Sequence, residues 1–212
     1  MAVAYDNKIV MNNTSGNFTV GNNKNRILII NSVGNTTPPT FNGVSFTKYT
    51  PASGIMGYTY VYYLLSPTVG EHTLNTTGHT YAICASFYNV DLRHPFGKIN
   101  TPVDFGGFGN AGTQTQTIAN TYAKSVDLEF SYGVTDYFDQ ITLQGVSTGQ
   151  VDLGVLFNDR LHSTAWSYEL GPAHGNNTMG RGHANSTNGA TTFMFLLELK
   201  GKYSPVPTSF NP

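Results

Sequence analysis

Charge is scarce in this chain of 212 residues, because only 11% of them are Asp, Glu, Lys or Arg, against about 25% in an ordinary soluble domain. The formal net charge is −1. No excess of basic residues is available to neutralise a phosphate backbone, which argues against a nucleic-acid partner. Asn, Thr, Ser and Gly, which favour strands and turns, stand in place of the helix-forming Lys and Glu. The composition predicts an all-β protein with many loops.

Cysteine and long apolar runs are also nearly missing. One Cys cannot form an internal disulfide, which argues against a disulfide-stapled secreted domain. Cys84 lies in the apolar run YAICASF and is expected to be a small core residue. No apolar run approaches the roughly 20 residues of a membrane span, so no membrane partner is expected. The start, MAVAYDNKIVMNN, lacks the basic and apolar regions of a signal peptide, which predicts synthesis in a cytoplasm.

Short apolar or alternating segments separated by Gly, Pro and Asn make up most of the chain. Residues 26–33 and 80–90 are continuous apolar runs of the length of buried strands. Asn42-Gly43 is a strong signal for a two-residue hairpin turn. The spacing predicts an antiparallel β-sandwich or jelly roll of about ten to twelve strands. We expect it to form a single domain over residues 1–201.

The tail differs in composition. Residues 202–212 read KYSPVPTSFNP, and their three prolines cannot join a central strand. One interpretation is a frayed terminus. The other is an extended arm that docks on an adjacent subunit, with Phe210 as its anchor.

Several segments recur here in a recognisable order: GNNKNRILIINSV, PTFNGVSFT, YYLLSPTVGEHTL, ICASFYNVDLRHPFG, AKSVDLEFSYG, SYELGPAHGNNTM and TTFMFLLELK. The series resembles a β-sandwich module found in phage virion and tail proteins and in bacterial surface proteins. The resemblance covers roughly residues 15 to 200. It departs at Tyr62 or Tyr63, where that module often has Trp. It implies a lectin-like sandwich or jelly roll, and it implies no known catalytic site.

Asp91, Arg93 and His94 form a charged group at the end of an apolar segment. Catalysis would require a nucleophile and a base within hydrogen-bond reach, oriented by a third group, and neighbours in one turn rarely meet that geometry. Pro95 biases the preceding residue toward extended backbone, and an Asp at a strand end can cap local N–H groups. We interpret the group as a turn, with contact to a ligand, calcium or a neighbouring subunit as the alternative.

Asp127 and Glu129 are a second pair of acids, set two residues apart in SVDLEFSY. Glycosidases use paired carboxyl groups that flank the sugar bond. The same alternation puts Val126, Leu128 and Phe130 on one face of the strand. The default expectation is therefore an apolar inner face, with the two acids on the solvent side.

The segment 171–183, GPAHGNNTMGRGH, is rich in Gly and holds His174, Arg181 and His183. It lacks the GK[ST] end of a phosphate-binding loop and the Cys or carboxylate ligands that usually accompany His at a metal. We expect a long Gly-rich connection between two late strands. The alternative is that this segment contacts a sugar or a partner subunit, because loops carry function on rigid sandwiches.

No cofactor is expected. Calcium takes six to eight oxygen ligands, usually from several loops. A structural calcium stays an alternative at the scattered acids Asp136, Asp139, Asp152 and Asp159.

Tyr58, Tyr60 and Tyr62 share one face of an aromatic segment. Tyr is enriched both where sugars stack and at subunit interfaces. We favour an interface over a sugar platform for whichever row of Tyr side chains faces outward.

Together these features predict a non-enzymatic virion structural protein, of the capsid-decoration or tail-associated kind, that forms a homo-oligomer with other virion subunits. The alternative is a carbohydrate-binding or adhesion module that contacts host glycans. A glycoside-active enzyme that uses Asp127 and Glu129 is the third hypothesis.

Overall fold

The computed structural model describes most of the chain, and all regular structure among the described residues is β-strand. The described residues are 1–12, 14–34, 36–49, 59–100, 103–104, 112–120, 125–134, 142–146, 148–158, 162–170, 175–184 and 191–202. Every pairing between their strands is antiparallel. The all-β antiparallel prediction is confirmed. The predicted arm lies, apart from Lys202, outside the described residues.

The first half of the chain forms two sheets, in the strand orders β2-β8-β4-β5 (sheet I) and β1-β9-β3-β7-β6 (sheet II). Their strands are β1 (Ala4–Met11), β2 (Ser15–Val20), β3 (Ile27–Val33), β4 (Thr40–Phe41), β5 (Val44–Ser45), β6 (Thr47–Tyr49), β7 (Thr59–Leu65), β8 (Gly70–Asn75) and β9 (Tyr81–Tyr88). The turn between β4 and β5 is the predicted hairpin. Asn42 and Gly43 have φ of 49° and 76°, as a type I′ turn requires.

The second half forms two more sheets, in the orders β10-β18-β13-β16-β15, with β11 also paired to β18 (sheet III), and β12-β17-β14 (sheet IV). Their strands are β10 (Phe96–Ile99), β11 (Val103–Asp104), β12 (Gly112–Asn120), β13 (Val126–Val134), β14 (Thr142–Val146), β15 (Val151–Asn158), β16 (His162–Leu170), β17 (Gly175–Ala184) and β18 (Thr191–Leu199).

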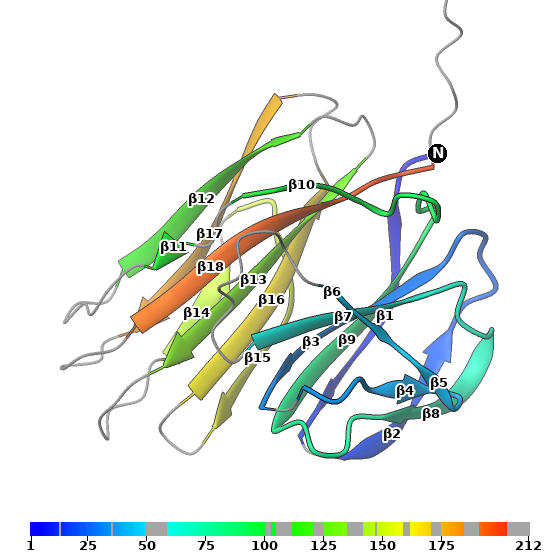
Figure 1. Ribbon diagram of the computed structural model, residues 1–212. Coiled ribbons are helices and arrows are strands. Elements are labelled where there is room, and N and C mark those ends of the chain that lie inside the picture. The colour runs from blue at the N-terminus through cyan, green and yellow to red at the C-terminus, as the bar shows by residue number, and fades with distance from the viewer. Residues whose placement is uncertain are drawn as a thin grey trace, which may run out of the picture.

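The four sheets stack in the order I, II, III, IV, with an apolar core in each of the three spaces between them. Figure 1 shows the two halves side by side, with sheets II and III facing each other. The arrangement confirms the predicted antiparallel β-sandwich and extends it from two layered sheets to four. The physical reason is visible in β3 and β9, which are buried along almost their whole length, because both faces of sheet II are covered.

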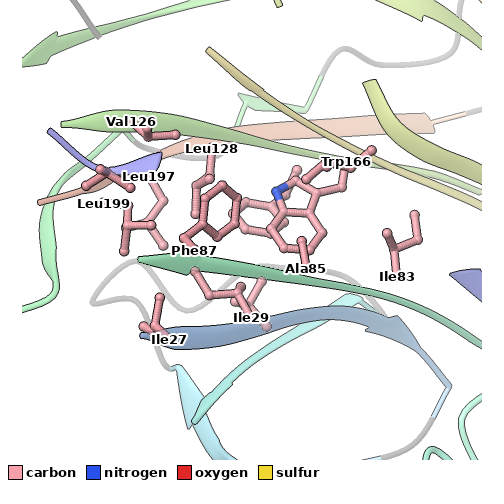
Figure 2. Close-up of a cluster of buried hydrophobic side chains, with 14 of the residues drawn as sticks. Ile27, Ile29, Ile83, Ala85, Phe87, Val126, Leu128, Trp166, Leu197 and Leu199 are labelled. Carbon is pink, nitrogen blue, oxygen red and sulfur yellow. The ribbon is translucent and has the colours of Figure 1, made fainter. Parts of the chain in front are cut away.

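The central core joins the two halves. Figure 2 shows Ile29 of β3 and Phe87 of β9 facing Leu128 of β13 and Trp166 of β16. The Trp166 ring stacks on Phe130 at a centroid distance of 5.3 Å. Each such side chain contributes about 1.5–3 kcal/mol on full burial. This core therefore holds the two halves in a fixed relation.

The outer faces of the stack carry uncharged polar side chains. In β2, Asn17 and Thr19 are exposed while Phe18 and Val20 are buried against sheet II. In β12, Thr113, Thr115 and Thr117 are exposed. Because Thr and Asn occupy these solvent-facing positions, the sequence contains few charged residues.

Two local expectations are wrong. Most of segment 171–183 is not a connection, because β17 covers residues 175–184 and pairs with both β12 and β14. Asp127 and Glu129 do not face solvent either, since sheet IV covers their face of β13 and both are fully buried. Several strands of only two or three residues also raise the strand number above the expected ten to twelve.

Candidate interaction sites

The segment that carries Asp91, Arg93 and His94 is a turn, as expected. Val90 is fully buried and forms a bridge with Gly201. The carboxylate oxygen Oδ1 of Asp91 accepts a hydrogen bond from the backbone N–H of Arg93 at 3.1 Å. The Asp91 carboxylate thus caps the turn, and Arg93 and His94 are exposed.

A pocket of about 470 Å³ opens at this turn, and we name it the strand-end pocket. It is lined by Asn25, Val90, Asp91, Leu92, Arg93 and Lys202. The Asp91 N–H donates to the Lys200 carbonyl at 2.9 Å, and the Lys202 N–H donates to the Asn89 carbonyl at 2.7 Å. These bonds tie the chain that leaves β18 to the turn that leaves β9. Segments distant in sequence therefore build the pocket on a fixed backbone.

A second hollow of about 610 Å³, the edge groove, lies where the edge strands β1 and β15 begin. It is lined by Ala2, Val3, Ala4, Tyr5, Gly149, Val151, Tyr168 and Glu169. The Tyr5 and Tyr168 rings stack at 5.3 Å with 19° between their planes, and Phe87 of the central core supports both rings edge-on. The groove is therefore an aromatic, mainly apolar surface on a rigid base.

The titratable groups of the edge groove reflect its apolar surroundings. Burial raises the pKa of both Tyr5 and Tyr168 above the ordinary value for tyrosine, and in Tyr5 the neighbouring Tyr168 and Asp6 raise it further. Burial also raises the pKa of Glu169, against the lowering effect of a hydrogen bond from Asn177. The hydroxyls of Tyr5 and Tyr168 therefore stay neutral at physiological pH.

A buried ion pair lies between sheets III and IV. Nη2 of Arg181 is 2.7 Å from Oε2 of Glu129, and both side chains are fully buried. Nη1 of Arg181 also reaches Oδ1 of Asp152 at 3.2 Å, and the Asp152 side chain is 39% exposed. Burial acts to lower the pKa of Arg181, but the carboxylates of Glu129 and Asp152 outweigh it and raise the pKa above its usual range. Arg181 is thus held as a cation.

Polar side chains complete the shell around Glu129. The hydroxyls of Ser131 and Ser167 both donate to its carboxylate, the latter at 2.7 Å. Nε2 of Gln150 donates to the Ser167 hydroxyl at 2.8 Å, and Oε1 of Gln150 accepts from the Gly180 N–H at 2.7 Å. Because Glu129 is covered and accepts from three side chains, its carboxylate is not placed to meet a substrate.

Asp127 is also enclosed. It is fully buried, and its Oδ2 accepts a hydrogen bond from Nδ2 of Asn177 on β17 at 2.7 Å. The pair proposed for sugar hydrolysis, Asp127 with Glu129, therefore does not flank an open cleft. Both acids serve contacts between sheets III and IV.

The remaining site residues predicted from the sequence differ in where the structure places them. Tyr62 and Arg181 are fully buried, which corrects the expectation that they meet a partner at the surface. The ring of Tyr62 lies edge-on to His79, and burial, with Tyr60 adding to it, raises the pKa of Tyr62 to about 12. Tyr60 is half-buried, with Nζ of Lys48 4.3 Å from its ring centroid.

The other residues predicted to make contacts cannot be placed in the same way. His183 belongs to β17, where its backbone pairs with Gly112 and Leu143. Tyr58, His174 and Phe210 lie outside the described residues. Their expected contacts stay predictions.

Sequence reasoning missed the role of β17. Its residues Asn177, Met179 and Arg181 recur at every second position and are all buried. That alternation was the available signal, but the surrounding glycines concealed it, because Gly is depleted in ordinary strands.

Among the described residues, no group of three or more His, Cys, Asp or Glu side chains is arranged to hold a metal ion, and the calcium alternative stays a prediction. The same residues contain no helix of the length and apolarity needed to cross a membrane. Comparisons with protein-family models, curated proteins and solved structures found no match.

Proposed function

We propose that this protein is a non-enzymatic structural component of a virion, a capsid-decoration or tail-associated protein that assembles with further copies of itself. The edge groove is the observation that carries this proposal. Its lining is apolar or aromatic except for Glu169, and Val151 in it is 46% exposed. Exposed apolar surface on a rigid base is typical of subunit interfaces.

The location of the groove favours a second copy of this chain as its occupant. β1 and β15 are edge strands of sheets II and III, and edge strands present backbone groups that can pair with another chain. The terminal ammonium group of Met1 donates to the Lys202 carbonyl at 3.2 Å. Lys202, after which the predicted arm continues, therefore lies beside the residue that precedes the groove. Fully extended, residues 203–212 would span at most about 33–36 Å.

The non-enzymatic character is supported by the surroundings of the acids. The two acids of the glycosidase hypothesis, Asp127 and Glu129, are fully buried between two sheets, and Glu129 forms an ion pair with Arg181. Hydrolysis requires that such carboxyl groups reach the sugar bond. The two residues named in the enzyme hypothesis, Asp127 and Glu129, are therefore not placed to act on a sugar.

Two matched substitutions test the assembly role. Val151 lines the edge groove and is 46% exposed, whereas Val69, just before β8 of sheet I, does not line it and is 37% exposed. In multi-angle light scattering after size exclusion, the wild-type protein is expected to form a defined oligomer, which Val151→Glu weakens and Val69→Glu leaves intact. A wild-type protein that stays monomeric at all accessible concentrations and does not associate with particles would refute the proposal.

Carbohydrate binding is the second candidate function, and the strand-end pocket favours it, because charged and apolar side chains share that pocket. A glycan array that stays blank both with and without calcium would remove this candidate.

A further inference from the structure

The strand-end pocket presents a cation and an anion that do not neutralise each other. Arg93 and Asp91 both line it, yet their side chains are not among the ion pairs within 4.0 Å that the described residues form. Oδ1 of Asp91 accepts from the Arg93 backbone N–H, which leaves Oδ2 without a described hydrogen bond. Each charged group can therefore bind a different part of one ligand.

The net formal charge of the residues that line the pocket indicates the charge of the ligand that it can bind. Arg93 and Lys202 contribute two positive charges and Asp91 one negative charge, which leaves one positive charge to be balanced. A monoanion balances it, whereas a second negative charge on the ligand would meet the Asp91 carboxylate at short range. A planar carboxylate also matches the paired N–H donors of a guanidinium group. The pocket therefore favours a single carboxylate over a phosphate monoester.

Other parts of the pocket suit hydroxyl and C–H groups. A free carboxylate oxygen, such as Oδ2 of Asp91, accepts hydrogen bonds from hydroxyl groups. Half-buried Leu92 packs against the central core and supplies an apolar contact. Asn25, which also lines the pocket, adds an amide whose Nδ2 has no partner among the described residues. An acidic peptide side chain offers a carboxylate but no ring of hydroxyls to use the Asp91 acceptor.

We propose that the strand-end pocket binds an acidic monosaccharide unit, such as a hexuronic or sialic acid residue of a glycan. Arg93, with Lys202 beside it, binds the sugar carboxylate. Asp91 accepts hydrogen bonds from ring hydroxyls, and Leu92 contacts the C–H face. This inference deepens the carbohydrate-binding candidate, and it is independent of assembly through the edge groove.

The test is a titration of the ¹⁵N-labelled full chain, followed by the chemical shifts of its backbone amides. The probes are glucuronate and N-acetylneuraminate, with glucose, acetate and inorganic phosphate for comparison. An acidic sugar should shift the amides of residues 90–93 and 202 and bind at least about tenfold more tightly than glucose or acetate.

Variants separate a sugar site from a cationic patch. Arg93→Gln should weaken glucuronate binding about tenfold or more. Asp91→Asn should weaken glucuronate while sparing acetate, and an Asn can still accept the turn hydrogen bond. Lys24→Gln removes an exposed cation outside the pocket lining and should change nothing.

Three outcomes would overturn the inference: acetate or phosphate binding as tightly as glucuronate, Asp91→Asn leaving glucuronate binding unchanged, or no shift at these amides with any acidic sugar. Thermal melting of each variant checks that it is folded. Light scattering on the same samples reports the assembly proposal separately, so that either proposal can fail without the other.

Discussion

The substitution Arg181→Met would leave a buried carboxylate without its cation. Arg181 supplies Glu129 with two hydrogen bonds, from Nη2 at 2.7 Å and from Nε at 3.4 Å, and both side chains are fully buried. Removing one partner of a buried ion pair typically costs about 3–5 kcal/mol. The hydroxyls of Ser131 and Ser167 would still donate to Glu129, which places the expected loss near the lower limit, at about 3 kcal/mol.

A loss of that size is easily measured. It lowers the ratio of folded to unfolded protein by a factor of roughly 100 to 200 and the melting temperature by about 6–12 °C for a chain of this length. Urea unfolding at pH 7 gives the free energy directly, provided that the slope with denaturant is unchanged. Lys24→Met, at an exposed cation, is the control and should fall within about 0.5 kcal/mol of wild type.

The double variant Glu129→Gln with Arg181→Met separates the ion pair from simple loss of packing. The glutamine introduced in place of Glu129 would be neutral. Because Ser131 and Ser167 contact different oxygens of Glu129, the glutamine oxygen would accept from one hydroxyl and its NH2 group would donate to the other. The double variant should therefore recover at least about 1 kcal/mol relative to the sum of the single variants, since paired residues are not additive. If Arg181→Met costs less than about 1 kcal/mol, or if the single effects simply add, the buried pair as described is wrong.

Other predictions concern the cores and the turns. Phe87→Ala should destabilise the chain by about 3–5 kcal/mol in urea, because Phe87 is fully buried and contacts Trp166, Tyr5 and Tyr168; a loss below about 1 kcal/mol would mean that sheets II and III do not share a core. Gly97→Ala would place a Cβ against Oε2 of Glu198 and disturb its bond from the Lys98 N–H, with an expected cost of about 1–3 kcal/mol, which an unchanged melting temperature would contradict. Burial lowers the pKa of His79 below its usual value, against a hydrogen bond to the Thr37 carbonyl that raises it. The unfolded chain therefore takes up a proton at His79 first as pH falls, so stability should decline through about pH 6.5 and below. His79→Gln should reduce that decline, whereas His94→Gln, at an exposed position, should not.

Much of the fold could be predicted because turn chemistry and apolar runs act locally. The hairpin at Asn42-Gly43 requires positive φ at both residues, which Asn and Gly tolerate. Buried β3 and β9 are continuous apolar runs, and Cys84 is buried as expected, which raises its pKa. The turn after β9 follows from Asp91 and Pro95.

The stacking of four sheets could not be predicted from the same signals. Alternation in β13 separates Leu128 from Glu129, but it does not say whether water or another sheet covers the polar face. Burial of the polar face depends on Arg181, which lies about fifty residues later and compensates the charge of the Glu129 carboxylate. The pockets depend on similarly remote pairings, such as Tyr5 with Tyr168 and Asp91 with Lys200, which composition and spacing do not encode.

Hydrogen–deuterium exchange at two protein concentrations can locate the surface through which the protein assembles. Raising the concentration from the monomeric to the oligomeric range should slow exchange at residues 2–5, Gly149 and Val151, which line the groove. Exchange in β8, on the outer sheet, should not change. Oligomer formation without added protection at the groove, or with protection confined to other strands, would contradict assembly through the edge groove.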